Sequence, residues 1–438
     1  MDRLQMTELE TYIQRFMEEQ GVPGLAVALS HRGETIYAKG FGVRNLVTKE
    51  PATPSTVFGI ASVTKSFTAA AIMQLAHEGK LSLDDPVGKY IPAFRLRGCD
   101  ASKVQIRHLL SHTSGVPPLL RREELVRFSE HLDYLAEVEF AALGEPGQYF
   151  SYANDMFLLL GAIIEQVSGR LYRRYMTERL LAPLRMHRST FSLEELARLD
   201  NVSTPYAKRG EQQQVTAVPW PTLGNYEVGG GIRSSVDDLL VYGSLYVAKG
   251  RYQGQEIVPA AWLETMWQPV HRLTKDAWYG YALKTTRDYA GVTLVEHGAG
   301  SRAYRPTSAL SRKKNSSASS CPISKTCRSA TSGWQRSTPR WRLPLAYKES
   351  AAPTYQLDRE ELEKLVGTYT SAEGGNVRLF IRDGAPVAEV AGSEFSLRAA
   401  ASDTLIFVDS DMPLRFFFKA DSRAWAVLLG MRMLCRSE

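Results

Sequence analysis

A stretch without hydrophobic periodicity, residues 301–342, divides the chain into two patterned regions and constrains the fold more than any other feature. This stretch is rich in Ser, Arg, Lys and Thr and shows neither the period of a strand nor that of a helix. Valine is absent between Val295 and Val366. We therefore predict two domains, over residues 1–345 and 346–438, with 301–342 as an aberrant segment at the end of the first.

The charge of the chain is concentrated in the same region. The chain of 438 residues has a formal net charge of +6, but between His297 and Lys348 it contains 11 Lys and Arg and no Asp or Glu. The remainder is net negative. Nucleic-acid-binding modules usually interleave basic residues with aromatic ones on one face. Since this pattern is missing, we predict no nucleic-acid partner.

Helix and strand patterns are clear on both sides of this stretch. In the first domain, Leu9, Ile13, Phe16 and Met17 follow a helical period, and strand, turn and helix signals follow. We predict strands over 25–30, 35–41 and 292–296, a turn at Arg32-Gly33, helices over 67–77 and 236–247, and helices with long loops over 80–225. In the second domain we predict a helix over 359–365 and strands over 377–381, 387–390, 405–408, 414–418 and 425–429.

Targeting and cysteine patterns favour a cytoplasmic protein. No run of about 18 apolar residues could span a membrane, and the N-terminus lacks the apolar region of a secretory signal. The four cysteines, Cys99, Cys321, Cys327 and Cys435, are spaced neither as a disulfide framework nor as a zinc site.

Ser62 and Lys65 are the first candidates for chemistry. If Ser62 opens a helix, Lys65 lies on the same face one turn later, so its amino group can reach the serine hydroxyl. A lysine at this distance can act as a base or lower the pKa of a neighbour. The same spacing recurs at Ser311–Lys314, to which we assign no function.

Two further sites follow along the chain. Tyr152 and Asn154 lie just before an apolar helix, where a phenol can share a proton with Ser62 and Lys65 and an amide can hold a substrate carbonyl. The run His297-Gly298-Ala299-Gly300 ends a predicted strand, and its small residues let a substrate lie along the backbone.

This order of motifs resembles the penicillin-recognising serine hydrolases, and more closely the class C β-lactamase-related branch. The blocks FGIASVTKSFTAAAIMQLAHEGKLSLDDPVGKYIP, IRHLLSHTSGV, FSYANDMFLLLGAIIEQVSG and GGGIRSSVDDLLVYG are similar to those of the family and occur in its order. The resemblance implies an α+β fold, with a β-lactamase/transpeptidase-like antiparallel sheet flanked by helices. The C-terminal strands resemble a lipocalin-like domain, a small antiparallel β-barrel.

The resemblance also implies roles for the candidate residues. Ser62 would be the nucleophile. Lys65 and Tyr152 would be the pair that takes and returns its proton, and either of them could be the base. Asn154 would position the substrate. His108 and His112, which are four residues apart, resemble structural histidines of the family rather than a metal pair.

The strand motif would complete the site. His297, Gly298 and Gly300 would contact the substrate, and the backbone N–H groups of Gly300 and Ser62 would form the oxyanion hole. Ala299 departs from the family, which usually has glycine there.

The implied activity is hydrolysis of an amide or ester bond through an acyl-enzyme, with no metal or organic cofactor. The partner would be a small-molecule or peptide substrate: a β-lactam, a peptide with D-residues or an ester. The alternative is a penicillin-binding or scaffold protein with little or no turnover. Self-association as a homo-oligomer is left open.

The segment after the strand motif departs furthest from the family. Its five large apolar residues between Arg302 and Arg342 are too few for the two buried central strands that the family has there. Our hypotheses are a compensated frameshift, which begins near Gly300 and ends near Leu343, or a disordered linker.

Overall fold

The computed structural model describes residues 3–209, 214–289, 292–298, 317–322, 331–332, 354–410, 412–419 and 423–437. The chain forms two compact units. The first comprises Met1–Asp85, Glu123–Phe128 and Leu160–Tyr347, and the second Pro86–Arg122, Ser129–Leu159 and Lys348–Glu438. The predicted domain boundary at residue 345 stays a prediction. Most of the aberrant segment, and with it the predicted loss of order, lies outside the described residues.

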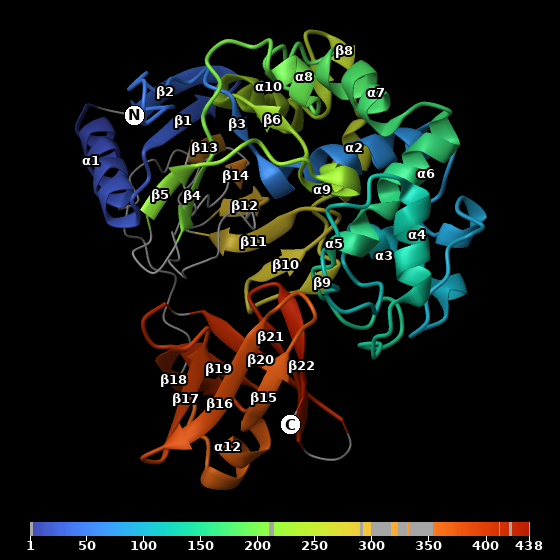
Figure 1. Cartoon of the computed structure of the whole chain (residues 1–438), viewed down its shortest axis with the longest axis vertical. Helices are drawn as coiled ribbons and strands as arrows, with labels where there is room; N and C mark the ends of the chain where they lie inside the picture. The colour runs from blue at the N-terminus through green and yellow to red at the C-terminus, as the bar shows by residue number, and fades with distance from the viewer. Residues whose placement is uncertain are drawn as a thin grey trace. The chain divides into compact units, whose positions relative to one another are not determined.

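The helices of both units are labelled in Figure 1, except for α11. They are α1 (Arg3–Gln20), α2 (Thr64–His77), α3 (Ile106–Leu110), α4 (Phe128–Glu137), α5 (Asn154–Phe157), α6 (Leu159–Ser168), α7 (Tyr172–Met176), α8 (Leu193–Leu196), α9 (Glu227–Gly230), α10 (Val236–Val247), α11 (Ala260–Thr265) and α12 (Arg359–Leu365).

The strands of the first unit form several antiparallel sheets. They are β1 (Gly24–His31), β2 (Glu34–Gly42), β3 (Phe58–Gly59), β4 (Tyr206–Arg209), β5 (Gln214–Ala217), β6 (Arg233–Ser234), β7 (Arg251–Tyr252), β8 (Gln255–Glu256), β9 (His271–Arg272), β10 (Ala277–Tyr279), β11 (Lys284–Tyr289), β12 (Val292–Glu296), β13 (Ser317–Pro322) and β14 (Thr331–Ser332). Two sheets have four strands each, in the orders β14-β13-β1-β2 and β12-β11-β10-β9.

The predicted first hairpin is confirmed and is covered by helices. Arg32 and Gly33 both adopt positive φ, 53° and 87°, which is the backbone of a tight turn that matches the twist of the strands. Leu25, Val27 and Leu29, which alternate along β1, form one apolar cluster with Ile13 of α1. Helix α1 lies beside β1 and β2 in Figure 1, and α10 lies against β1 and β13. Apolar side chains on both faces of β1 therefore hold it between helices.

Strand β13 corrects one expectation about the aberrant segment. It pairs with β1 from Leu25↔Pro322 to Ser30↔Ser317, so this part of the segment does supply a strand within the sheet. Strand pairing uses main-chain N–H and C=O groups, which every non-proline residue carries. A run of small residues can therefore occupy a strand position that lacks the expected large apolar residues.

Helix α2 forms the centre of the first unit. Every residue from Thr64 to Ala76 is buried, and the helix contacts α7, α9 and α11. A helix that is apolar or small on all sides is stable only in an interior. The predicted helix over 67–77 is confirmed, although it begins three residues earlier and so includes Lys65.

The second unit contains a closed barrel of eight antiparallel strands, which confirms the predicted C-terminal barrel. The strands follow in chain order: β15 (Gly367–Thr370), β16 (Asn376–Arg382), β17 (Ala385–Val390), β18 (Ser393–Ala401), β19 (Thr404–Phe407), β20 (Pro413–Phe418), β21 (Ala424–Leu429) and β22 (Arg432–Arg436). Its likeness to lipocalin domains stays a prediction.

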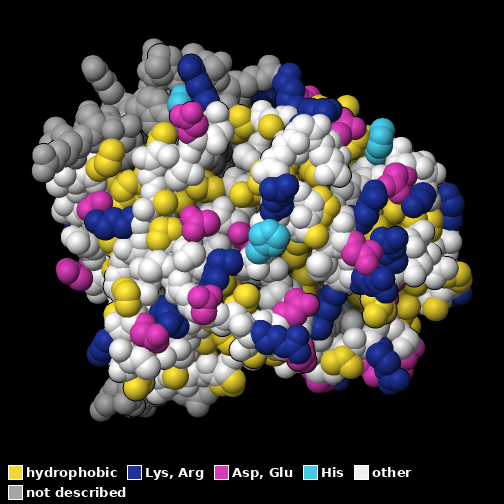
Figure 2. Space-filling view, turned by 90° about the horizontal axis from the view of Figure 1, so that it is seen from above, with side chains coloured by type: hydrophobic (Ala, Val, Ile, Leu, Met, Phe, Trp, Pro, Cys, Tyr) yellow, Lys and Arg dark blue, Asp and Glu magenta, His cyan; other side chains and the backbone are white. Residues whose placement is uncertain are grey.

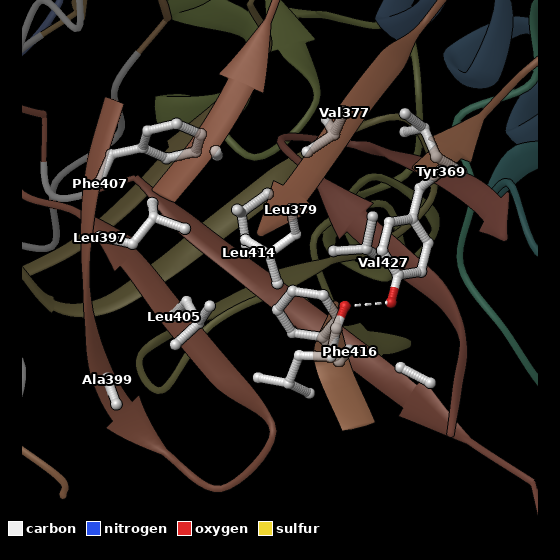
Figure 3. Close-up of a cluster of buried hydrophobic side chains, with 14 residues drawn as sticks. Tyr369, Val377, Leu379, Leu397, Ala399, Leu405, Phe407, Leu414, Phe416 and Val427 are labelled. Atoms are coloured by element: carbon white, nitrogen blue, oxygen red, sulfur yellow. Dashed lines mark hydrogen bonds between the residues drawn. The ribbon is translucent and has the colours of Figure 1, made fainter. Parts of the chain in front are cut away.

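Apolar side chains fill the interior of this barrel. Leu379, Leu405, Leu414 and Phe416 are at most 2% exposed and belong to one cluster (Figure 3). The Tyr369 hydroxyl, which is inside the cluster, donates a hydrogen bond of 2.6 Å to the carbonyl of Leu365. Closure pairs the strand edges, and the alternation of side chains gives the barrel its own core.

Two properties of the described surface and helices bear on partners. None of the helices that the structure describes is both long and apolar enough to cross a bilayer. On the face shown in Figure 2, Lys and Arg side chains lie among Asp and Glu side chains, so the described residues form no continuous basic surface on that face.

A buried histidine makes the stability of the fold depend on pH. His131 on α4 is fully buried, its Nε2 donates a hydrogen bond to the Asp155 carbonyl, and burial lowers its pKa to about 4 from the ordinary 6.5. Between pH 6.5 and 4, His131 is protonated in the unfolded chain but stays neutral in the folded chain. The free energy of unfolding therefore decreases as the pH falls from 6.5 towards 4.

We therefore expect His131→Gln to make the protein less sensitive to acid. In this range His131 lowers the free energy of unfolding by about 1.4 kcal/mol for each pH unit of acidification. At pH 5 the variant should therefore have lost about 2 kcal/mol less stability, relative to pH 7, than the wild type. Thermal unfolding at pH 7, 6 and 5, followed by circular dichroism, measures the effect. Equal pH dependence in wild type and variant would show that folding does not lower the pKa of His131.

Candidate active site

Ser62 and Lys65 lie together at the start of the central helix. Ser62 is half-buried in a 3-10 turn (Ala61–Val63) that leads into α2, and Lys65 is 1% exposed in the first turn of α2. Lys65 Nζ lies 3.5 Å from Ser62 Oγ. The predicted spacing on one helix face is therefore confirmed, and the lysine amino group reaches the serine hydroxyl.

The backbone before the helix is held in a strained conformation. Ala61 has φ 42°, a left-handed value that residues with a Cβ rarely adopt. Strands β3 and β6 pair just before it, the Ile60 N–H donates to the Ile232 carbonyl at 3.1 Å, and the Ile232 N–H donates to Thr64 Oγ1 at 3.1 Å. These bonds fix both sides of the turn, which is how a strained residue persists at a functional site.

Gly229 on α9 positions the lysine. Lys65 Nζ donates a hydrogen bond of 2.9 Å to the Gly229 carbonyl. A Cβ at Gly229 would lie 2.7 Å from the same nitrogen, whereas a Cβ at the neighbouring Gly230 would meet nothing closer than 3.9 Å. Gly229 is a site residue that was not predicted from the sequence. The run of three glycines, Gly229 to Gly231, is the signal that could have indicated it, because glycine lets the backbone and a side chain approach closely.

His297 is neutral and belongs to the same unit. It follows β12, is 4% exposed, and its Nδ1 donates a hydrogen bond of 2.6 Å to the Gly298 carbonyl. Burial, and then the positive charge of Lys65, lower the pKa of His297 to about 3. Nε2 therefore carries no proton near neutral pH and accepts from the Tyr279 hydroxyl at 3.4 Å.

The rest of the strand motif is only partly described. Gly298 is exposed directly after His297, where a ligand could approach its backbone. Gly300, predicted as an oxyanion donor, and Ala299 lie outside the described residues. Their roles stay predictions.

Tyr152 and Asn154 belong to the second unit. Tyr152 is 5% exposed, its ring centroid lies 4.1 Å from that of His112, and its N–H donates to the Met431 carbonyl at 2.8 Å. Asn154 is half-buried and opens α5. Since both lie in the unit that does not contain Ser62, their action on it is part of the proposal made below.

The two histidines of the HLLSHTSG block make structural contacts. His108 Nδ1 accepts the Gln105 N–H at 3.1 Å and helps to cap α3. His112 Nδ1 accepts the Ala153 N–H at 3.3 Å, and its ring packs on Phe150, Tyr152 and Phe157. His112 therefore helps to fix the segment that carries Tyr152.

Curated proteins similar to this chain share part of its length. It is 34% identical to Protein flp of Staphylococcus aureus (strain MW2) over 190 residues, which are 42% of this chain and 38% of that protein. It is 30% identical to a β-lactamase of Pseudomonas fluorescens over 234 residues, which are 53% of this chain and 62% of that one. The aligned part thus spans less than two thirds of each relative.

Solved structures extend the similarity to the whole fold. The octameric penicillin-binding protein homologue from Pyrococcus abyssi has a TM-score of 0.65 and 26% identity, and the match covers 98% of this chain and 100% of that one. A D-stereospecific amidohydrolase from Streptomyces sp. has a TM-score of 0.52 and 26% identity, with 64% of this chain and 83% of that one covered.

The family comparison covers the part of the chain that holds the candidate site residues. The β-lactamase family model matches residues 9–311, and this range includes Ser62, Lys65, Tyr152 and His297. The fold is β-lactamase/transpeptidase-like, as expected from the order of the motifs. The chain belongs to the β-lactamase family.

Proposed function

We propose that the protein is a serine hydrolase that cleaves an amide or ester bond through a covalent acyl-enzyme on Ser62. The observation that carries the proposal is the buried Lys65 amino group, 3.5 Å from the half-buried Ser62 hydroxyl and hydrogen-bonded to the Gly229 carbonyl. A nucleophilic serine needs a neighbouring group that takes or stabilises its proton, and this arrangement meets that requirement.

In the proposed reaction, Ser62 Oγ attacks the substrate carbonyl and forms a tetrahedral intermediate. Its proton passes to the pair Lys65 and Tyr152, and then to the leaving amine or alcohol as the bond to the carbonyl carbon breaks. Water next attacks the carbonyl carbon of the acyl-serine and gives one proton to the same pair. The bond between that carbon and Ser62 Oγ then breaks, the product leaves as a carboxylic acid, and the pair returns the proton to Ser62 Oγ. The backbone N–H groups of Ser62 and Gly300 would stabilise the negative oxygen in both steps.

The substrate contacts are part of the same proposal. The Asn154 amide would bind the substrate carbonyl. His297 and Gly298 would contact another part of the substrate, and the neutral imidazole of His297 would add no charge there. A relative named β-lactamase and a structural neighbour named D-stereospecific amidohydrolase support β-lactams and D-residue peptides as candidates. Esters, the cytoplasmic location and self-association stay predictions.

A second candidate is a penicillin-binding protein of the same fold with little or no turnover. The observation that favours it is the end of the family match at residue 311, inside the segment that lacks the family's apolar pattern. Such a protein would form the acyl-enzyme and fail to release it.

Covalent labelling distinguishes the two candidates. The protein is treated with a fluorescent penicillin or a fluorophosphonate, and the labelled peptide is identified by mass spectrometry. Label on Ser62 together with steady turnover of nitrocefin or a p-nitrophenyl ester supports the hydrolase, and label without turnover supports the binding protein. Full-length protein without label on Ser62 would contradict both.

A further inference from the structure

One hairpin of the barrel lies on the segment that carries Tyr152. The turn between β21 and β22 places the Met431 carbonyl 2.8 Å from the Tyr152 N–H, and the Met433 N–H donates to Ser151 Oγ at 3.1 Å. Two hydrogen bonds thus attach consecutive residues of the segment to the two sides of one turn. The barrel therefore fixes the main chain at Tyr152.

Arg432, which lies between these two contacts, faces the phenol ring. Its guanidinium carbon is 5.2 Å from the centroid of the Tyr152 ring, within the range of a cation–π interaction. Glu373 forms an ion pair with the same guanidinium. Burial of Arg432 opposes its charge, but Glu373, Tyr152 and Asp155 outweigh this and raise the pKa of Arg432. The arginine therefore keeps its positive charge next to Tyr152.

Within this unit, other charged or titratable groups also surround Tyr152. His112 packs on the ring, and its Nδ1 carries no proton because it accepts the Ala153 N–H. Asp155 and Glu373 are close enough to Arg432 to affect its charge. Lys65, which acts on the same proton in the proposed reaction, belongs to the other unit. A positive charge at this distance favours the ionised form of a phenol.

The barrel itself suggests why it is attached. Apolar side chains of the barrel itself fill its interior (Figure 3). Other parts of the unit can therefore contact the barrel at its outer wall and its turns. Tyr149, three residues before Tyr152, packs edge-on against Phe417 and Trp425 of that wall, with centroids 5.6 and 5.4 Å apart. The barrel thus contacts the Tyr152 segment through aromatic packing, hydrogen bonds and one charge.

We propose that Arg432 is a positioning residue supplied by the barrel, which holds the Tyr152 ring and favours the phenolate that accepts the Ser62 proton. The proposal rests on the proposed hydrolase function. It makes the barrel part of the catalytic apparatus, although none of its residues need touch the reacting bond.

The pH profile of kcat/KM tests this role with a neutral p-nitrophenyl ester. In Arg432→Gln the acidic limb should move up by about one pH unit, so that kcat/KM below the limb falls about tenfold. Arg432→Lys keeps the charge and should retain the wild-type profile to within about threefold. An equal loss at every pH, or no change, would overturn the proposal.

Arg382→Gln is the matched control. Arg382 also belongs to the barrel, also pairs with a glutamate, Glu394, and also lies 5.2 Å from an aromatic ring, but that ring belongs to Phe380. Its substitution should leave the pH profile of kcat/KM unchanged.

The same variants are assayed with nitrocefin, which carries a carboxylate. A loss confined to nitrocefin would assign Arg432 to substrate binding and overturn the positioning role.

A titration without turnover separates this proposal from the hydrolase itself. The ultraviolet difference between the protein and its Tyr152→Phe variant reports ionisation of Tyr152, and it is recorded with and without Arg432→Gln. We expect Tyr152 to ionise about one pH unit higher without the arginine. Equal titration in both backgrounds would overturn the proposal even if Ser62 is a working nucleophile. A shift in protein that does not label on Ser62 would support the electrostatic effect while the hydrolase fails.

Discussion

Ser62→Ala is expected to abolish hydrolysis of nitrocefin and p-nitrophenyl esters, with a fall in kcat of roughly 10⁴- to 10⁶-fold. The substitution removes the attacking oxygen and, with it, the hydrogen bond of 3.5 Å from Lys65 Nζ. We therefore expect the free energy of unfolding to change by no more than about 1 kcal/mol. Steady-state kinetics and thermal unfolding on the same preparation measure the two effects.

Ser66→Ala is the control for this substitution, because it removes a nearby hydroxyl with a structural role. Ser66 Oγ donates to the Val63 carbonyl and accepts from the Tyr242 hydroxyl, and the residue is 2% exposed. Its loss should cost about 1 kcal/mol of stability and leave labelling of Ser62 intact. Wild-type turnover in Ser62→Ala would show that another residue is the nucleophile.

Gly229→Ala is expected to lower kcat/KM by about 100-fold without unfolding the protein. The new methyl group would lie 2.7 Å from Lys65 Nζ, so the amino group must move away from Ser62. A displacement of about 1 Å can cost this much in rate. Gly229 lies in a helix and does not have positive φ, so alanine suits its backbone and favours the helix by up to about 1 kcal/mol.

Gly230→Ala gives the comparison, because it makes the same change one residue later in the same helix. There the methyl group would be 3.9 Å from its nearest neighbour, which is ordinary contact. We expect kcat/KM within about twofold of wild type and a similar melting temperature in both variants. Equal activity of the two variants would show that the position of Lys65 does not limit the reaction.

The parts of the fold that follow from local signals could be predicted from the sequence. The predicted ranges 236–247, 292–296 and 359–365 agree with α10, β12 and α12. Ser235 caps α10 by accepting the Asp238 N–H. Caps and hydrophobic periods act within a few residues, so they can be read along the chain.

Short strands in the first unit could not be predicted in the same way. The region 80–225 was expected to hold helices and loops, yet β4 and β5 form a hairpin there, and β7 to β10 have only two or three residues each. Such strands have too few residues to show a period. These short strands form because they pair with neighbouring strands in the folded chain.

The candidate site also combines contacts that follow from local sequence with contacts that follow from the tertiary structure. The sequence by itself determined that Ser62 and Lys65 meet, because a spacing of three residues on a helix brings two side chains together whatever surrounds them. Only the tertiary structure decided that the Gly229 carbonyl holds the lysine, that burial keeps His297 neutral, and that Arg432 lies on the ring of Tyr152. The last pair is separated by 280 positions in the chain. Such contacts depend on how distant segments pack and exclude water, and no local pattern records that.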